Sequence, residues 1–507
     1  MEAAAQVFVE SPDVVYGPRL SRCNTSTGRR VSREGVLKVN NGCTLTVAVL
    51  ANPPHLSWPT RSCRKEANYY GSLTQAGTLS LGSDTEGQEV FVPFSALLPM
   101  AAPNHLVFDG WGISSLNLAQ AMLRAKVLEW ELQEQVWPHM EALPRQPSID
   151  IPEFIADNLV PDSRPQQLEQ IRRDIPDFRS SSGLDKVTVL WTGNTERFCE
   201  VVPGLKDTAQ NPLRTTGLGL QVSPSTLFAV AGIREGCAFL SGSPQNTLVP
   251  GALELACQRQ VFVGGDDFKS GQTKVKSVLV DFLISCGLKT MSIVSYKHLG
   301  NNDGHNLSAP LQFRSKEVSK SNVVDDMVRS NPVLCRPGEE PDHCVVIKYL
   351  ANAGRDQHTG VQDTCQDSLL AAPITLDRAL LTKLCQPVSF CADADPEPQT
   401  FHPVLSLLSF LLKALLVPPC SPLISALFRQ HSCIKNILRA CVGLPPQNHM
   451  LLEHKMERPG PGLKQLGRVA AACPVSNKKG LEPASTKDCT DDANGHPQVE
   501  EAQMPTT

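Results

Sequence analysis

The chain has 507 residues, and 47 lysines and arginines against 51 aspartates and glutamates leave a formal net charge of −4. A chain of this length buries a sizeable core, and it predicts two folded units followed by a tail. The nearly balanced charge gives no sign of a nucleic-acid-binding surface.

Seventeen cysteines are scattered without C-x-x-C pairs, and no apolar secretory segment precedes them. Their odd number and lack of pattern favour reduced thiols in a cytoplasmic protein. No metal-ligand spacing emerges from the 12 histidines, so we expect no metal site. The glycosylation sequons at Asn24 and Asn306 are then chance matches.

Alternating strand-like and helix-like segments predict an α/β fold. Residues 106–108 form a predicted strand that leads to a helix beginning near Ser114, and residues 186–191 lead into a loop at Thr192. Residues 404–417 form the most apolar predicted helix, which is too short to span a membrane and contains Lys413, so we expect it in the core. From residue 455 onward Pro, Gly, Lys, Glu and Thr dominate without periodicity, which predicts a disordered tail.

The sequence GGDDFKSGQTK at residues 264–274 follows a strand-like segment and precedes a helix-like run through Phe282. There the amides of a helix start and the hydroxyls of Ser270 and Thr273 converge where a phosphate would bind. Nearby positive charge would come from Lys269, Lys274 and Lys276. The alternative is an ordinary strand-to-helix connection, because Gly, Ser, Asp and Thr also fill simple turns. It is not a Walker loop, since Gln272 stands where that motif has lysine.

A second polar cluster covers SYKHLGNNDG at residues 295–304 and RSKEVSK at residues 314–320. A predicted strand over residues 288–296 places Asn301, Asn302 and Asp303 in the loop at its carboxyl end, where open α/β sheets bind ligands. Lys316 and Lys320 share one face if their segment is helical, and their repulsion would then need an anionic ligand or carboxylates to offset it. The alternative is a solvated basic face, neutralised by the two aspartates at 325–326.

Both clusters closely resemble motifs of the eukaryotic myo-inositol-1-phosphate synthase family, also called inositol-3-phosphate synthases. The similarity extends from VFVES at residues 7–11 through KEANYYGS at 65–72 to LPPQN at 444–448. The resemblance implies NAD-dependent isomerisation of glucose 6-phosphate to 1D-myo-inositol 3-phosphate, by oxidation, intramolecular aldol cyclisation and reduction, in inositol and phospholipid biosynthesis. It also implies a cytoplasmic homotetramer, or a hetero-oligomer with an intact relative, without nucleic-acid or membrane partners.

The same resemblance implies a Rossmann-like NAD-binding domain that is built from two separated parts, residues 1–273 and 371–454. Residues 274–370 would form an inserted α+β domain for catalysis and tetramerisation. Residues 455–507 would be the disordered tail.

The family motifs also imply roles for individual residues. Lys316 would move the proton of the oxidised hydroxyl, and Lys413 would stabilise an oxyanion. Asp267 and Asp303 complete the expected catalytic set. The expected phosphate cradle is Ser270, Gly271, Gln272 and Thr273, with Lys320. The expected cofactor contacts are Asn40, Asn41, Ser148, Thr192, Gly193, Asn194, Thr195, Gly242, Ser243, Asp267, Ser270, Asn301, Asn302, Asp303, Lys316, Asp367 and Ser368. The alternative for Lys413 is a snorkelling lysine on an apolar helix.

The chain also departs from the family pattern. Of the loop G-W-G-G-N-N-G-[ST] only NNGCT at residues 40–44 remains, so we expect the first strand of the nucleotide fold to be incomplete. The family's D-G-W-D ends here in Gly112, and an Asn-Gln segment after Ala156 is absent. The G-D-S-K motif is replaced by a segment with Arg355, whose guanidinium stays protonated and cannot shuttle a proton. Lys297 and Gly193 stand where the family has Asn and Ala.

Three functions therefore remain open. They are an active synthase, a catalytically impaired member that assembles with an intact relative, and a different NAD-dependent oxidoreductase. The intact phosphate turn and the three lysines favour the first, whereas the missing loops favour the second.

Overall fold

The computed structural model describes residues 34–40, 42–83, 88–98, 100–143, 146–149, 159–160, 163–217, 222–294, 306–334, 342–346, 367–392 and 395–447. They all belong to one compact unit, which ends at Gln447. The segment for which we expect disorder, residues 455–507, lies outside the described residues.

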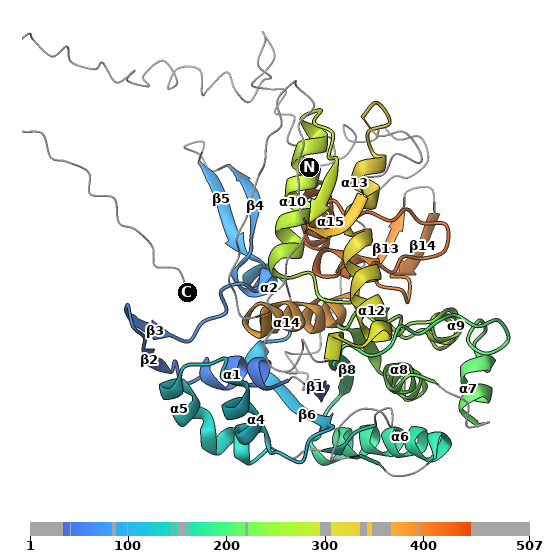
Figure 1. The fold of residues 1–507 in the computed structure, drawn as a ribbon. Helices are drawn as coiled ribbons and strands as arrows, with labels where there is room; N and C mark the ends of the chain where they lie inside the picture. The colour runs from blue at the N-terminus through green and yellow to red at the C-terminus, as the bar shows by residue number, and fades with distance from the viewer. Residues whose placement is uncertain are drawn as a thin grey trace, which may run out of the picture. The chain divides into compact units, whose positions relative to one another are not determined.

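A six-stranded parallel sheet forms the centre of this unit (Figure 1). Its strands are β1 (Glu34–Asn40), β6 (Leu106–Gly112), β7 (Gln146–Pro147), β8 (Lys186–Thr192), β9 (Ala238–Ser241) and β10 (Val263–Gly264). They lie in the order β10-β9-β8-β1-β6-β7, and every neighbouring pair is parallel. Numbered along the chain and read from β7, this order is 3-2-1-4-5-6, which is the order of doubly wound dinucleotide-binding sheets. The predicted α/β class is confirmed.

The central position of the sheet belongs to β1, the strand that we expected to be incomplete. It has seven residues and pairs along its length with β6 on one side and β8 on the other, with Asn40 opposite Thr192. The expectation was wrong because the segment before Asn40 contains a Gly-Val-Leu-Lys-Val run whose β-branched residues favour an extended backbone.

Helices cover both faces of the sheet. Side chains along a strand alternate between faces, so Val189 of β8 enters one apolar cluster and Leu190 enters another. The first cluster includes α6 (Arg164–Ser181) and α8 (Pro224–Arg234), and the second includes α1 (Cys43–Ala51) and α14 (Asp367–Cys385). Segments from the two ends of the chain therefore share one core.

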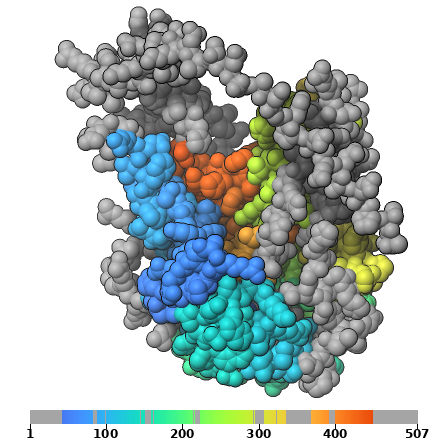
Figure 2. Space-filling model, turned by 60° about the vertical axis from the view of Figure 1, so that its left-hand side comes forward, coloured from blue at the N-terminus to red at the C-terminus, as the bar shows by residue number. Residues whose placement is uncertain are grey.

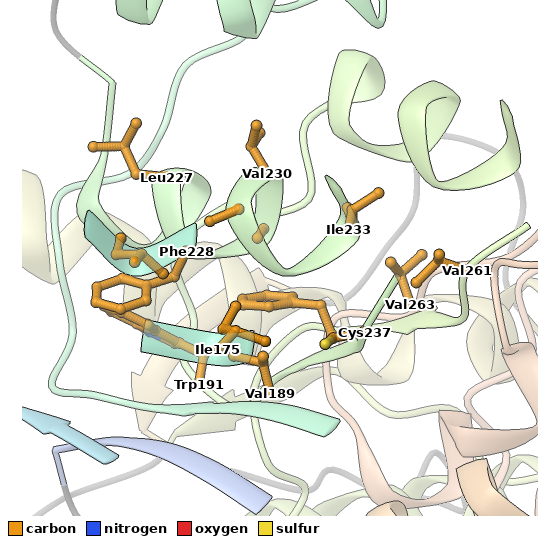
Figure 3. Packing of buried hydrophobic residues seen from close by; sticks show 14 of the residues in the cluster. Ile175, Val189, Trp191, Leu227, Phe228, Val230, Ile233, Cys237, Val261 and Val263 are labelled. Carbon is orange, nitrogen blue, oxygen red and sulfur yellow. The ribbon is translucent and has the colours of Figure 1, made fainter. Parts of the chain in front are cut away.

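Helix α8 shows how tightly the first face is packed. Its residues from Pro224 to Ile233 are all buried, so this helix has no polar solvent face. Phe228 lies against Trp191, with ring centroids 5.5 Å apart, and Ile175 of α6 joins them (Figure 3). This packing fixes β8, whose carboxyl end carries Thr192.

A smaller cluster lies beyond β10. It is formed by the apolar sides of α10 (Gly271–Ser285), β11 (Ser292–Val294), η3 (Asn322–Val324) and α13 (Asp325–Arg329). The lysine-bearing helix α12 (Pro310–Ser321) contacts η3, and β12 (Asp342–Val346) pairs with β11 in parallel. Helix α10 contains Phe282 as predicted, and α12 confirms that Lys316 and Lys320 lie on a helix.

Helix α15 (Leu427–Cys441) packs on α10 and reaches the hairpin of β4 (Thr78–Ser83) and β5 (Glu89–Pro93). There Arg439 donates a hydrogen bond to the Ser80 carbonyl. Figure 2 shows this carboxyl-terminal region, in orange, between the light-blue hairpin and the yellow-green α10. The remaining elements are β2 (Ser57–Pro59), β3 (Arg64–Glu66), α2 (Leu73–Ala76), α3 (Phe94–Leu97), η2 (Pro103–His105), α4 (Leu118–Ala125), α5 (Trp130–Glu141), α7 (Gln210–Gly217), α9 (Pro250–Arg259), β13 (Ser389–Ala392), β14 (Asp395–Thr400) and η4 (Ser406–Leu411).

The apolar segment 404–417 is buried as expected, but the single helix predicted there is wrong. Only η4 is helical, and it is a 3-10 helix. Before it, Leu405 donates its amide to the Val263 carbonyl, and after it Leu412 forms an antiparallel bridge with Phe268. Pairing with the free edge of β10 satisfies the backbone in place of helical hydrogen bonds. Within the described residues, no helix combines the length and apolarity that crossing a membrane requires.

Candidate active site

The turn between β10 and α10 carries the motif predicted to bind phosphate. Ser270 stands at the N-cap of α10 with an extended backbone, and its side chain makes no capping hydrogen bond. Gly271 has a φ of 46°, a left-handed conformation that glycine adopts without strain. The Ser270 hydroxyl therefore does not bond to the first-turn amides. These amides form the positive end of the helix dipole.

A buried ion pair lies at the same turn. Lys413 Nζ is 3.0 Å from Asp267 Oδ2, and the two side chains are only 6% and 5% exposed. Backbone pairing holds them together, because the Lys413 amide donates to the Asp267 carbonyl at 3.0 Å and the Ala414 amide to the Asp266 carbonyl at 3.1 Å. The snorkelling alternative for Lys413 is thus excluded by its burial and its partner.

Asp267 is also contacted from α12. The Ser319 hydroxyl donates to Asp267 Oδ2 at 2.5 Å. Burial by itself would raise the pKa of Asp267, but the charges of Lys413 and Lys316, together with the hydrogen bonds from Ser319 and Lys413, lower the pKa to about 2. Asp267 is therefore ionised at neutral pH, paired with Lys413 and attracted by the charge of Lys316.

Two of the lysines expected near a phosphate point to carbonyl oxygens instead. Lys269 is fully buried, and its Nζ donates to the Ser425 carbonyl at 3.1 Å. Lys276 Nζ donates to the Lys320 carbonyl at 2.6 Å. Burial, with a contribution from the charge of Lys413, lowers the pKa of each to about 8. Lys274 lies over the Phe410 ring, 5.5 Å from its centroid, and burial lowers its pKa.

The predicted cofactor residues gather at the carboxyl edge of the sheet. Asn40 ends β1 beside Thr192 at the end of β8, and Ser148 follows β7. Gly193 and Ser243 are joined by the Ser243 hydroxyl, which donates to the Gly193 carbonyl at 2.5 Å.

The next loop along this edge leads directly to the ion pair. The Phe268 amide donates to the Gly242 carbonyl at 3.2 Å, and the Asp267 amide donates to the Ser243 carbonyl at 3.1 Å. A Cβ on Gly242 would lie 2.2 Å from the Phe268 ring, so only glycine fits this close approach. The loops after β8, β9 and β10 therefore form one hydrogen-bonded surface.

The structure describes only some of the remaining predicted site residues. Asn194 and Thr195 follow Gly193 in the same loop, Asp367 begins α14, and Ser368 lies half-buried in its first turn. Helix α14 packs against α1, the helix that follows Asn40. The predicted site residues outside the described part of the chain are Asn41, Asn301, Asn302 and Asp303.

The residues at the sheet edge fit a dinucleotide in several respects. Helix α1 starts at Cys43 directly after the central strand, and Gly42 at its N-cap has no side chain to occupy the first amides. The Ser148 hydroxyl is fully buried and finds no hydrogen-bond partner within the described residues, which suits a ligand contact. One feature is lost: β6 ends in Gly112, so the family's second carboxylate is absent there.

Three residues at this site were missed in the sequence. Ser319 lies one helical turn from Lys316 inside the quoted motif, so helical spacing would have found it. Asp266 is buried, and burial raises its pKa to about 7. Arg378 of α14 is fully buried, lies 5.2 Å from the Phe268 ring centroid and donates to the Gly264 carbonyl at 3.1 Å. No local pattern marks Arg378, because only tertiary packing brings α14 under this turn.

Metal and disulfide chemistry is not visible in the part of the chain that is described. There, no group of three or more His, Cys, Asp and Glu side chains has a metal-binding arrangement. Ten cysteines in that part are free thiols.

A doubly wound parallel sheet with polar loops at its carboxyl edge, beside a buried lysine–aspartate cluster, defines a nucleotide-binding α/β protein suited to an anionic substrate. A family model of NAD-binding proteins described as myo-inositol-1-phosphate synthase matches residues 36–439. The chain belongs to the myo-inositol-1-phosphate synthase family, whose cofactor is NAD.

Individual relatives agree over the whole length. Inositol-3-phosphate synthase 1 of Macaca fascicularis is 72% identical and that of Homo sapiens 71% identical, with 100% of both chains covered in each comparison. The crystal structure of inositol-3-phosphate synthase from Caenorhabditis elegans is 47% identical with a TM-score of 0.80, covering 85% of this chain and 89% of that one.

The comparison with the Macaca fascicularis protein also gives a difference in length. The alignment with the Macaca fascicularis protein has 559 positions and this chain has 507 residues, so 52 positions carry no residue of this chain. The chain is therefore shorter than the aligned length, in the direction expected from the family segments predicted to be missing.

Proposed function

We propose that this chain isomerises glucose 6-phosphate to 1D-myo-inositol 3-phosphate with one bound NAD. The observation that carries the proposal is the buried pair of Lys413 and Asp267, 3.0 Å apart beside the uncapped start of α10. Oxidation at C5 of the sugar acidifies the C6 protons, and the resulting enolate closes the ring on the C1 aldehyde. Each of these stages builds charge on oxygen, which ammonium groups in a poorly hydrated site stabilise strongly.

NAD, held by the loops that follow β1, β8 and β9, would supply the oxidation and the reduction of the sugar. In our proposal Lys413 donates hydrogen bonds to the oxyanion that develops during cyclisation, and Lys316 moves the proton of the C5 hydroxyl. Asp267 keeps the Lys413 ammonium group in place, because its ionised carboxylate is bonded to Lys413 and Ser319, and its charge also attracts Lys316. Asp303 completes the proposed catalytic set.

The phosphate of the substrate is proposed to bind residues 270–273 together with Lys320. Replacing both hydroxyls, in S270A/T273V, is expected to raise KM for glucose 6-phosphate about 10- to 100-fold with a smaller effect on kcat, since these contacts act equally in ground and transition states. Inhibition by inorganic phosphate should weaken in parallel. An unchanged inhibition constant for inorganic phosphate would contradict this assignment.

We also infer a domain division from the proposed function. Residues 1–273 and 371–454 would bind NAD and supply Lys413, and residues 274–370 would carry Lys316, Lys320 and the subunit contacts of a cytoplasmic tetramer. Support comes from the apolar cluster in which α1 and β8 pack with α14 and η4.

A second candidate function is that of an impaired subunit that assembles with an intact relative. The specific observation in its favour is the deficit of 52 aligned positions. The family's active-site lysine of the G-D-S-K motif falls among the departures, and Arg355 in the replacing segment cannot exchange a proton near neutral pH.

One experiment separates the two functions. The purified full-length chain is assayed for retained NAD and for inositol phosphate formed from glucose 6-phosphate, with an intact relative as positive control. We expect retained NAD and turnover. A chain without turnover that co-purifies with a tagged intact relative would instead establish the assembly role.

A further inference from the structure

Helix α12 is fastened to the loop that follows β8. The Ser315 hydroxyl donates to the Glu196 carbonyl at 2.9 Å, and the Asn306 amide group, just before the helix, donates to the Thr195 carbonyl at 3.0 Å. The Phe198 amide donates to the Leu311 carbonyl at 3.4 Å. Asn306 is thus buried and engaged at its sequon position.

The other end of α12 is fastened to the phosphate turn. Ser319 donates to Asp267, and the Lys320 carbonyl accepts a hydrogen bond from Lys276 of α10. The helix therefore bridges two loops that leave different strands of the sheet, β8 and β10.

The two serines of α12 lie on one face of the helix, and its two lysines lie on the neighbouring face. Ser315 and Ser319 are four residues apart, so they share a face, and both are fully buried at 0% and 1% exposure. Lys316 and Lys320 repeat with the same spacing about 100° further round the helix, and both are half-buried. Hydrogen bonds hold the serine face in place, and this fixes the direction in which Lys316 and Lys320 point.

We propose that Ser315 is a positioning residue that couples the cofactor loop, residues 192–198, to Lys316. A buried hydroxyl that donates to a carbonyl has no water to replace that acceptor, so the bond strongly restricts the helix. Displacement of the loop shifts the peptide bond that precedes Lys316, and with it the Lys316 ammonium group, whose charge acts on Asp267. The effect on catalysis rests on the proposed function, whereas the mechanical link does not.

Hydrogen–deuterium exchange of the full chain tests the link without any turnover. In S315A, amides of α12 and of residues 193–198 should both exchange at least about fivefold faster, although the two segments are far apart in sequence. Ser321 makes no capping hydrogen bond, so S321A on the same helix is the matched control and should change neither segment. Acceleration confined to α12, or an equal effect of S321A, would overturn the proposal.

Steady-state kinetics supply the catalytic arm. S315A should lower kcat about 10- to 100-fold while retained NAD and KM for glucose 6-phosphate stay within about twofold, because the lysine is misplaced rather than removed. A fall in retained NAD in proportion to kcat would show simple loss of folded protein and overturn the positioning role. If the unaltered chain has no turnover, the proposed function fails, and the exchange result still decides whether the link exists.

Discussion

Replacing Lys413 by Met is expected to lower turnover of glucose 6-phosphate about 10³-fold and to reduce the free energy of unfolding by about 3–5 kcal/mol. Turnover falls because the variant loses the ammonium group proposed to stabilise the cyclisation oxyanion. Stability falls because Asp267 remains buried and charged without its partner at 3.0 Å. Initial rates and urea denaturation at pH 7 measure the two effects.

Two further variants make that prediction specific. The double variant D267N/K413M should recover most of the lost stability but none of the activity, since it removes the unpaired charge and leaves the catalytic group missing. Lys65 pairs with Glu129 at 3.4 Å on the surface, and K65M should cost at most about 1 kcal/mol. A K413M protein with normal turnover would refute the assigned role of Lys413.

Replacing Asp266 by Asn is expected to change how stability depends on pH. Burial raises the pKa of Asp266 from 3.8 to about 7, against the Ser241 hydrogen bond and the charge of Arg378. Between these two values the folded chain holds a proton that the unfolded chain has released, so stability falls as pH rises from about 4 to about 7. The fall amounts to about 4 kcal/mol and should be absent from the D266N variant.

Denaturation curves for wild type and D266N at several pH values from 4 to 7.5 provide the measurement. The difference in unfolding free energy between the two proteins should shift steadily in favour of D266N as pH rises. Asp207 is an exposed carboxylate whose hydrogen bonds, first from the Gly204 amide, lower its pKa, so its contribution changes below pH 4 and D207N should not reproduce the shift. Parallel curves for wild type and D266N would contradict the prediction.

Lysines at the site act in a different pH range. Lys269 and Lys276 have a pKa of about 8 in the folded chain and 10.5 ordinarily. The unfolded chain therefore binds more protons between these values, and stability rises as pH increases from 8 to 10.5. This window does not overlap with that of Asp266, so the two effects are measured separately.

Local patterns in the sequence were sufficient for the family and the α/β class, and they predicted which residues would form the site. The phosphate turn, the paired lysines of α12 and the strands β6 and β8 are each set by neighbouring residues, because spacing along the chain determines which side chains share a helix face or follow a strand. The sequence also predicted missing family segments, since strings that resemble the family are interrupted there.

Only the tertiary structure decided how these pieces meet. It placed β1 at the centre of the sheet and brought Arg378 beneath Phe268. The apolar segment around Lys413, predicted as a helix, instead pairs with the turn after β10. The physical reason is that burial stabilises an apolar segment in either a helical or an extended conformation. Contacts with neighbouring segments of the fold therefore determine which conformation it adopts. The contact between Lys413 and Asp267 spans 146 residues of sequence, and no local pattern records a partner at that distance.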